Sequence, residues 1–313
     1  MIEYLDVEPL VSVFLITYNH ENYISKAIDS VLMQKCNFMF EIVIGEDCSD
    51  DNTKLICEEY SKKYSNIKII TSSANVGLMN NFLRTSKACK GKYIAMLEGD
   101  DYWTDPNKLQ KQVDFLESRP DFILCFHNRN HQIGDVVYED LLCNYDEEKY
   151  FIFEEIIYAS IHTLTVVFRN IFNEHPYPKQ FHQLPLYDFA LWAYLSLFGK
   201  CAYLNFTGAT YRLHANGFYS GGDNIPNYVK WMNSQITIRS YFPKRYQRNY
   251  KNFILMLNFM LTEELRNRKV YGKYGYYLLM LFFRSIAYSN YEYVIFYKSV
   301  YKTVLKKYIK SLF

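Results

Sequence analysis

The first hundred residues alternate between short apolar segments and segments of helical spacing, and no other feature constrains the fold as strongly. The apolar segments are residues 11–17, 40–44, 67–70 and 93–97. Between them apolar residues recur at helical spacing, as from Ile24 to Leu32. Strands that alternate with helices in this way predict an α/β fold with a doubly wound, mostly parallel sheet and right-handed crossovers.

Polar side chains follow three of these predicted strands. They are Thr17, Tyr18 and Asn19 after the first strand, Glu46 and Asp47 after the second, and Glu98, Asp100 and Asp101 after the fourth. Ligands of such sheets bind beyond the carboxyl ends of the strands. Residues 49–51 are typical of a cap for the next helix. Glu98, Asp100 and Asp101 repel one another, and a divalent cation is the usual compensation.

Two common nucleotide-binding motifs are absent from the sequence. No G-x-G-x-x-G follows the first strand, and no G-x-x-x-x-G-K-[ST] occurs. This argues against dinucleotide-dependent hydride transfer and against P-loop phosphoryl transfer. A sheet edge that presents carboxylates can hold a diphosphate only through a bridging Mg²⁺ or Mn²⁺.

Several short motifs occur in a characteristic order. They are Val-Ser-Val-Phe-Leu-Ile-Thr-Tyr-Asn at 11–19, Glu-Ile-Val-Ile-Gly-Glu-Asp-Cys-Ser-Asp-Asp at 41–51, Asn-x-Gly at 75–77, Lys-Gly-Lys-Tyr-Ile-Ala at 90–95, Glu-Gly-Asp-Asp-Tyr-Trp-Thr-Asp-Pro at 98–106 and Tyr-Arg-Leu-His at 211–214. With this order and spacing, the chain from Val11 to about Gly221 resembles the inverting family 2 glycosyltransferases of the GT-A fold.

The resemblance implies a site for a nucleotide-sugar donor. Asp47 would accept a hydrogen bond from the pyrimidine imide, Thr17 and Asn19 would line the base and ribose pocket, and Asp100 would lie near the ribose. The implied donor site also includes Tyr18, Glu46, Asn75, Gly77 and Arg212. Asp101, with Glu98 and His214, would hold the metal, although a lone His such as His214 is more often structural.

This sequence departs from the family pattern at two positions. Glu98 stands in place of the usual first Asp of the D-x-D element, which lengthens the carboxylate arm. Phe82 stands where many members have an Arg after the Asn-x-Gly turn, which removes one candidate donor contact.

Inverting transfer also needs a base for the acceptor hydroxyl. In the resembled family this base is an Asp that opens a helix, and Asp188 matches it before an apolar helical segment. The alternative role for Asp188 is a helix N-terminal carboxylate. The acceptor pocket is expected to include Trp103, His162 and Thr163.

The charge of the chain is distributed unevenly. Residues 1–224 carry 19 Lys and Arg against 30 Asp and Glu, a balance of −11, whereas residues 225–313 carry 16 against 3, a balance of +13. We therefore expect a GT-A domain at 1–222 and a basic, aromatic-rich helical region at 223–313. Its lysine stripe (Lys298, Lys302, Lys306 and Lys310) favours contact with an anionic membrane surface, with a solvated helix face as the alternative and no motif for nucleic acid.

The sequence thus predicts an inverting glycosyltransferase that depends on Mn²⁺ or Mg²⁺. The donor would be a nucleotide-diphosphate sugar, with a UDP-sugar favoured, and the acceptor a glycan or a lipid-linked saccharide in cell-surface polysaccharide synthesis. An inactive nucleotide-sugar-binding scaffold and a nucleotidyltransferase are the alternatives. Seven scattered cysteines, an acidic N-terminus and no spanning segment favour a cytoplasmic enzyme, peripheral at the inner face of the plasma membrane.

Overall fold

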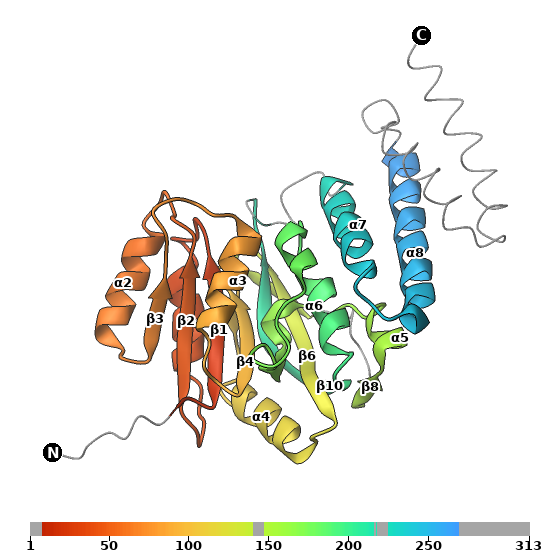
Figure 1. Cartoon of the computed structure of the whole chain (residues 1–313). Helices are drawn as coiled ribbons and strands as arrows, with labels where there is room; N and C mark the ends of the chain where they lie inside the picture. Colours follow the sequence, from red (N-terminus) through yellow and green to blue (C-terminus); the bar gives the residue numbers. More distant parts are fainter. Residues whose placement is uncertain (1–7, 140–146, 216, 218–224, 269–313) are drawn as a thin grey trace, which may run out of the picture. The chain divides into compact units, whose positions relative to one another are not determined.

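The computed structural model describes residues 8–139, 147–215, 217 and 225–268 (Figure 1). The chain divides into two compact units, Met1–Gly221 and Gly222–Phe313. The first unit contains the sheet and the site, and the second contains helices.

One mixed sheet of ten strands forms the centre of the first unit, within the part of the chain that is described. The strands are β1 (Val11–Thr17), β2 (Phe40–Glu46), β3 (Ile67–Ile70), β4 (Tyr93–Glu98), β5 (Tyr102–Trp103), β6 (Phe122–Ile133), β7 (Val136–Glu139), β8 (Lys149–Phe151), β9 (Val167–Arg169) and β10 (Lys200–Leu213). Their order is β3-β2-β1-β4-β9-β6-β10-β5, with β7 beside β6 and β8 beside β10. The pairs among β1 to β4 and the β6–β10 pair are parallel, which confirms the predicted class.

The burial of β1 explains its mostly apolar sequence. All seven of its residues are buried, so both faces of the sheet are covered there. The parallel register then brings strand ends together, because Thr17 pairs with Glu46 and Ile16 pairs with Glu98. The polar residues that follow β1, β2 and β4 therefore lie at one edge of the sheet.

Six helices and two short 3₁₀ helices accompany the strands in the described part of this unit. They are α1 (Ile24–Leu32), α2 (Thr53–Lys63), α3 (Leu78–Ala88), α4 (Lys108–Ser118), α5 (Phe153–Ile156), α6 (Asp188–Leu195), η2 (Thr163–Thr165) and η3 (Lys179–Gln183). In α6 the residues from Ala190 to Leu195 are all buried. This burial agrees with the uniformly apolar sequence after Asp188, and the predicted helix start at Asp188 is confirmed.

The second unit contains α7 (Ile225–Arg239) and α8 (Lys244–Arg268). The two helices pack through aromatic side chains, including an edge contact between Trp231 and Phe253, and the Tyr250 hydroxyl donates to Gln235. No helix in the described part of the chain is both long and apolar enough to cross a bilayer. The predicted lysine stripe from Lys298 to Lys310 lies outside the described residues.

Candidate active site

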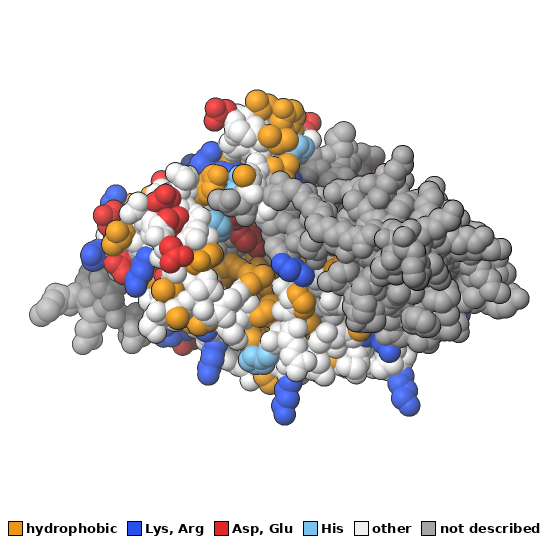
Figure 2. Space-filling model, turned by 90° about the horizontal axis from the view of Figure 1, so that it is seen from above, with side chains coloured by type: hydrophobic (Ala, Val, Ile, Leu, Met, Phe, Trp, Pro, Cys, Tyr) orange, Lys and Arg blue, Asp and Glu red, His pale blue; other side chains and the backbone are white. Residues whose placement is uncertain are grey.

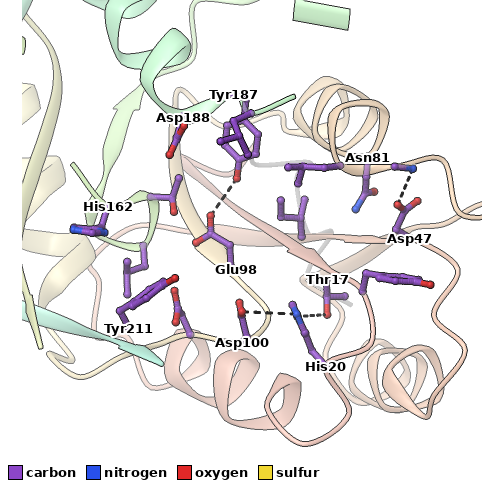
Figure 3. A pocket seen from close by; sticks show the side chains of 18 of the residues that line it. Thr17, His20, Asp47, Asn81, Glu98, Asp100, His162, Tyr187, Asp188 and Tyr211 are labelled. Carbon is purple, nitrogen blue, oxygen red and sulfur yellow. Dashed lines mark hydrogen bonds and ion pairs between the residues drawn. The ribbon is translucent and has the colours of Figure 1, made fainter. Parts of the chain in front are cut away.

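A cavity of about 570 Å³ lies at the carboxyl edge of the sheet in the first unit (Figure 3). Figure 2 shows acidic side chains recessed in the middle of this face, beside apolar ones. Of the residues expected from the sequence, the cavity is lined by Thr17, Tyr18, Asp47, Asn75, Gly77, Glu98, Asp100, Asp101, His162, Thr163 and Asp188. The structure therefore brings these eleven residues to one site, whereas His214 is not among the lining residues but contacts Asp100.

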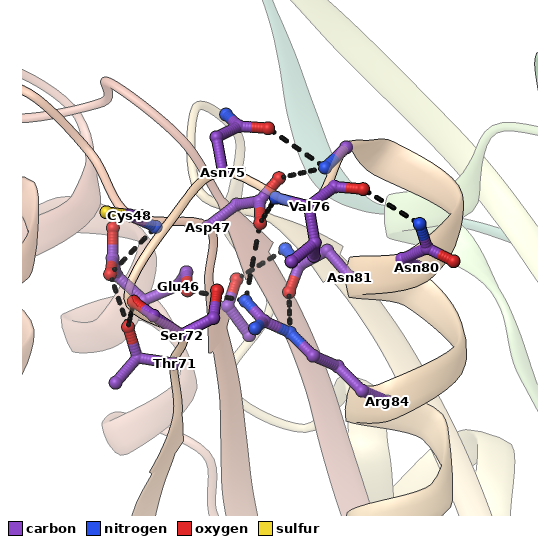
Figure 4. Close-up of polar contacts among 12 residues, drawn as sticks. Glu46, Asp47, Cys48, Thr71, Ser72, Asn75, Val76, Asn80, Asn81 and Arg84 are labelled. Carbon is purple, nitrogen blue, oxygen red and sulfur yellow. Dashed lines mark hydrogen bonds and ion pairs between the residues drawn. The ribbon is translucent and has the colours of Figure 1, made fainter.

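Asp47 lines the cavity and lies beside the loop that leads into α3 (Figure 4). Its Oδ1 accepts the backbone N–H of Val76 at 2.9 Å, and its Oδ2 accepts that of Gly77 at 3.0 Å. The side chain is almost fully buried. These bonds fix the loop that leads into α3, so Asp47 shapes this end of the cavity. Its contact with a pyrimidine base stays a prediction.

Arg84 is a residue of this region that the sequence did not indicate. Its Nη2 lies 3.4 Å from Asp47 Oδ1 and donates to the carbonyl of Glu46 at 2.8 Å. Its Nε donates to Asn81 Oδ1 at 3.0 Å. The Phe82 ring instead stacks on Tyr187, with 4.2 Å between ring centroids. Arg84 thus provides a positive charge beside Asp47, although Phe82 occupies the position where the family often has Arg.

Gly77 has a backbone conformation that side chains disfavour, with φ 83° and ψ 159°. We expect Gly77→Ala to lower the free energy of unfolding by about 1–3 kcal/mol, because this region of φ/ψ space is essentially restricted to glycine. A Cβ at this position would meet no atom within 4 Å, so the cost comes from the backbone alone. Chemical denaturation measures it.

Gly134→Ala is the control for this substitution. Gly134 also has a positive φ, 57°, and open space where a Cβ would lie, but it belongs to the β6–β7 turn and does not line the cavity. Only the Gly77 variant should also weaken nucleotide binding. Unchanged stability and binding in Gly77→Ala would contradict this role for the turn.

Asn19 and Glu46 do not line the cavity, which corrects the expectation that they contact the donor. Asn19 Oδ1 accepts the N–H of Asp50 at 2.9 Å. Glu46 accepts the N–H of Ser49 at 2.7 Å and the hydroxyl of Thr71 at 3.0 Å. Both side chains hold the loop after β2, because its backbone donors would otherwise lack partners.

Asp100 lies between two histidines. His214 Nε2 is 3.1 Å from Asp100 Oδ2, and His20 Nε2 is 3.8 Å from the same oxygen. Burial by itself would raise the pKa of Asp100, but the hydrogen bond with His214 and the nearby His20 outweigh it and leave the pKa below its usual value. Burial lowers the pKa of His20, and Asp100 opposes this effect.

Asp101 is turned away from this pair of histidines. Its Oδ1 accepts the backbone N–H of Arg212 at 2.8 Å, and the residue is only 1% exposed. Burial, with Asp100 and Glu98 nearby, raises its pKa well above the usual value. Arg212 does not line the cavity; its guanidinium lies over Tyr102, 4.5 Å from the ring centroid, and donates to the Asp100 carbonyl. Arg212 therefore supports the loop rather than facing the cavity as expected.

Glu98 extends from the end of β4 toward α6. The Tyr187 hydroxyl donates to Glu98 Oε1 at 3.1 Å. Burial raises the pKa of Glu98 to about 7, with Asp100 and Asp188 adding to the rise and Thr163 and Tyr187 opposing it. This hydrogen bond connects the end of β4 to the start of α6, the helix that begins at Asp188.

Asp188 is the first residue of α6 and lines the cavity. Its Oδ1 accepts the N–H of Phe189 at 2.8 Å. Burial raises its pKa to about 6. A carboxylate with this pKa is mostly ionised at neutral pH and is a better proton acceptor than an ordinary Asp. The base and helix-terminal roles are compatible in this geometry.

His162 lines the other end of the cavity with Arg129 and Tyr211. Arg129 Nη2 is 3.1 Å from His162 Nε2, and its guanidinium lies over the Tyr211 ring. Burial, and then Arg129, lower the pKa of His162 to about 3, so the imidazole is neutral. Trp103 is buried in the core, where its Nε1 donates to the Leu164 carbonyl, so the expectation that it contacts an acceptor is wrong.

The Asp100–His214 pair fits a divalent cation that also binds a diphosphate. Carboxylate and imidazole are suitable ligands, and Mg²⁺ is usually bound through one or two carboxylates plus substrate phosphates. Among the described residues, no group of three or more His, Cys, Asp or Glu side chains is arranged to hold a metal without a substrate. The geometry favours Asp100 over Asp101 as a ligand, because Asp101 is directed at the Arg212 backbone.

Known proteins are similar to this unit in both sequence and fold. The family model for glycosyl transferase family 2 matches residues 12–175. An uncharacterised glycosyltransferase of Haemophilus influenzae is 31% identical over 226 residues, which cover 66% of this chain and 67% of that protein. The putative teichuronic acid biosynthesis glycosyltransferase TuaG of Bacillus subtilis is 35% identical over 112 residues, 36% of this chain and 44% of TuaG.

An uncharacterised protein of Mycobacterium tuberculosis is 41% identical over 130 residues, 41% of this chain. The match spans only 36% of that protein's length. The similarity therefore covers less than half of either protein.

Two solved structures share the fold at low sequence identity. TarS residues 1–349 of Staphylococcus aureus, in complex with UDP-GlcNAc, has a TM-score of 0.55 and 17% identity over 82% of this chain and 85% of that one. The mannosyltransferase PcManGT of Pyrobaculum calidifontis, in complex with GDP-Man and Mn²⁺, has a TM-score of 0.57 and 10% identity over 97% and 83%. The expected GT-A class is thereby confirmed. With the family match over more than half of its residues, the chain belongs to glycosyl transferase family 2.

Proposed function

We propose that this chain transfers a sugar, with inversion, from a nucleotide-diphosphate donor to a hydroxyl group of a glycan or lipid-linked acceptor. The observation that carries the proposal is that Asp47, Asp100 and Asp188 line the same cavity. Asp47 would contact the base, Asp100 would lie at the diphosphate, and Asp188 would face the acceptor. A UDP-sugar is the favoured donor.

At the donor end, Asp100 and His214 would hold Mn²⁺ or Mg²⁺. The bound cation would neutralise charge on the diphosphate, which is otherwise repelled by Glu98, Asp100 and Asp101. The Mn²⁺ of the PcManGT complex supports this cofactor for the fold. The assignment replaces Asp101 with Asp100 as the principal carboxylate ligand.

At the acceptor end, Asp188 would act as the base. The acceptor oxygen attacks the anomeric carbon while its proton passes to Asp188. The bond between that carbon and the diphosphate oxygen breaks, and its electron pair leaves with the nucleoside diphosphate. Attack from the face opposite the leaving group inverts the anomeric configuration.

The name of one related protein supports the proposed acceptor class. TuaG is named for teichuronic acid biosynthesis. This supports a role for the chain in the synthesis of a cell-surface polysaccharide.

Turnover with a panel of sugar nucleotides, with products analysed by mass, tests the function. Transfer of a sugar residue and release of a nucleoside diphosphate would support the proposal. Transfer of a nucleotide with release of pyrophosphate would indicate a nucleotidyltransferase. Donor binding without turnover by the wild-type protein, across the donor and acceptor panel, would favour an inactive scaffold.

We also propose that the basic C-terminal region holds the protein on an anionic membrane surface. Residues 225–313 carry 16 Lys and Arg against 3 Asp and Glu. Each basic residue near such a surface contributes about 1 kcal/mol, which salt reduces. We expect the full chain to float with anionic vesicles at low salt and to be partly released at high salt. Flotation that is equal with neutral vesicles, or absent with anionic ones, would contradict this proposal.

A further inference from the structure

His162 lies directly before η2, in the part of the cavity wall that is distant from Asp47. Its backbone carbonyl accepts the N–H of Thr165 at 3.0 Å and the hydroxyl of Thr165 at 2.7 Å, so the main chain is fixed there. The His162 side chain is partly exposed and lines the cavity. Figure 3 shows His162 and Asp188 on the side of the cavity away from Asp47. The proposed function places the acceptor on this side.

Arg129 determines which nitrogen of His162 carries the proton. Arg129 Nη2, from β6, is 3.1 Å from His162 Nε2. A guanidinium group can only donate hydrogen bonds, so Nε2 must be the acceptor. The imidazole is neutral, because burial and Arg129 lower its pKa to about 3. Its one proton therefore lies on Nδ1, and His162 is a hydrogen-bond donor rather than a base.

The Nδ1–H group of His162 is accessible from the cavity. No residue in the described ranges forms a hydrogen bond with Nδ1, and Nδ1 is not one of the fully buried atoms that lack a partner there. The atom therefore keeps accessible surface on a side chain that lines the cavity. An N–H group in this position can donate to an oxygen of a ligand, such as a hydroxyl or ring oxygen of a sugar.

The charge of the cavity favours an uncharged sugar at this point. Among the described lining residues, Arg129 is the only Lys or Arg, whereas five are carboxylates: Asp47, Glu98, Asp100, Asp101 and Asp188. Asp188 must be ionised to accept a proton, and a second negative charge beside it would be repelled. A neutral sugar can bind to His162 without this cost.

We propose that the Nδ1–H of His162 binds an oxygen of an uncharged acceptor sugar, and that Arg129 is the positioning residue that fixes this hydrogen-bond donor. The inference rests on the proposed function, because it identifies a group that recognises the acceptor in that site. It makes the acceptor class a glycan that ends in a neutral sugar. It also separates acceptor binding by His162 from proton transfer to Asp188.

The kinetic test uses the full chain, the UDP-sugar that the wild type uses best, and four octyl glycosides as acceptors. Three are neutral (glucoside, galactoside and N-acetylglucosaminide), and the fourth is the glucuronide. We expect transfer to at least one neutral glycoside and weaker transfer to the glucuronide. His162→Leu removes the N–H group and should raise the acceptor KM by about 3- to 10-fold, the usual effect of losing a neutral hydrogen bond. The UDP-sugar affinity, measured by calorimetry, should stay within about twofold.

Two further variants complete this comparison. His162→Asn places an amide N–H donor near the position of Nδ1 and should restore most of the acceptor affinity. His131→Leu is the matched control, because His131 is also partly exposed and stacks on Tyr138 but does not line the cavity. This control should have the KM of the wild type, and thermal unfolding checks that each variant is folded.

NMR of protein labelled with ¹⁵N-histidine tests the role of Arg129 independently of activity. Long-range ¹H–¹⁵N spectra distinguish the two neutral tautomers, and the His162 signal is the one that disappears in His162→Asn. We expect the Nδ1–H tautomer in the wild type, with no titration between about pH 5.5 and 8.5, since the pKa of His162 is about 3. Arg129→Leu removes the group that donates to Nε2, so the Nε2–H tautomer should become populated.

Each contrary result has a separate meaning. An Nε2–H tautomer in the wild type would overturn the inference even if His162→Leu does not fold. An unchanged acceptor KM in His162→Leu, or equal weakening of acceptor and UDP-sugar, would also overturn it. A wild type that transfers sugar to water or to the glucuronide but to none of the neutral glycosides would contradict the neutral acceptor and leave the proposed function standing. A wild type that transfers sugar neither to water nor to any glycoside would contradict both.

Discussion

Asp188→Asn should lower turnover by about 10²- to 10⁴-fold, because a positioned general base contributes this much to the rate. The affinity for the nucleotide should stay close to that of the wild type, since Asp47 lies across the cavity from Asp188 (Figure 3) and Asp100 is unchanged in this variant. The Asn side chain retains an oxygen that can accept the Phe189 N–H, so the start of α6 should be preserved. Steady-state rates and nucleotide calorimetry on the same preparation measure the two effects.

The pH dependence of the wild type provides a second measurement for Asp188. The base must be ionised to accept a proton, and burial raises its pKa to about 6. Activity should therefore fall as the pH decreases through about 6, rather than near the value of about 4 for an ordinary Asp.

Asp51→Asn is the control for the Asp188→Asn substitution, because Asp51 bonds to the N–H of Thr53 at the start of α2 but does not line the cavity. Equal losses of turnover in Asp51→Asn and Asp188→Asn would make Asp188 only a helix carboxylate.

Asp100→Asn should weaken the metal-dependent part of nucleotide diphosphate binding by at least about 10- to 100-fold. Mutation of a residue that hydrogen-bonds to a metal ligand already lowers metal affinity by about 10- to 100-fold, and Asp100 would itself be a ligand. Its contact with His214 at 3.1 Å is the reason for this assignment. Titration with UDP in the presence of Mn²⁺, and again with EDTA, separates the metal-dependent part from the rest.

Asp101→Asn is the comparison that decides between the two adjacent carboxylates. Its amide oxygen can still accept the Arg212 N–H, which is the bond that Asp101 makes in the structure. We expect this variant to keep most of its metal dependence. If Asp101→Asn loses metal dependence and Asp100→Asn keeps it, the ligand is Asp101, as the sequence resemblance implied.

The sequence identified many of the residues that line the cavity. It also assigned to the site some residues whose side chains bond elsewhere in the fold. Asn19 and Glu46 follow strands that lead to the site, yet their oxygens bond to backbone N–H groups of the loop after β2. Trp103 follows the acidic motif but is buried in the core, where its Nε1 donates to the Leu164 carbonyl. Sequence order alone does not show whether a polar atom at a strand end is used by a loop or faces a ligand.

Other site residues carried little or no signal in the sequence. Arg129 lies within β6 and Asn81 within α3, and both line the cavity. Tyr187 and His20 stand beside residues that the motifs did indicate, Asp188 and Asn19, so adjacency is the one signal that pointed to them. Their roles depend on partners distant in the chain, such as Glu98, which is 89 residues from Tyr187.

The sequence by itself determined the strand and helix order, the class of the sheet and the positions of Asp47 and Asp100 at one edge, whereas Asp188 was indicated only by the family resemblance. It did so because strand periodicity is a local pattern, and right-handed connections between parallel strands place their carboxyl ends at the same edge. Only the tertiary structure decided that His214 contacts Asp100, that Asp101 is turned toward the Arg212 backbone, and that Tyr187 reaches Glu98. Those choices depend on packing and on hydrogen-bond partners far apart in the chain, which no local pattern specifies.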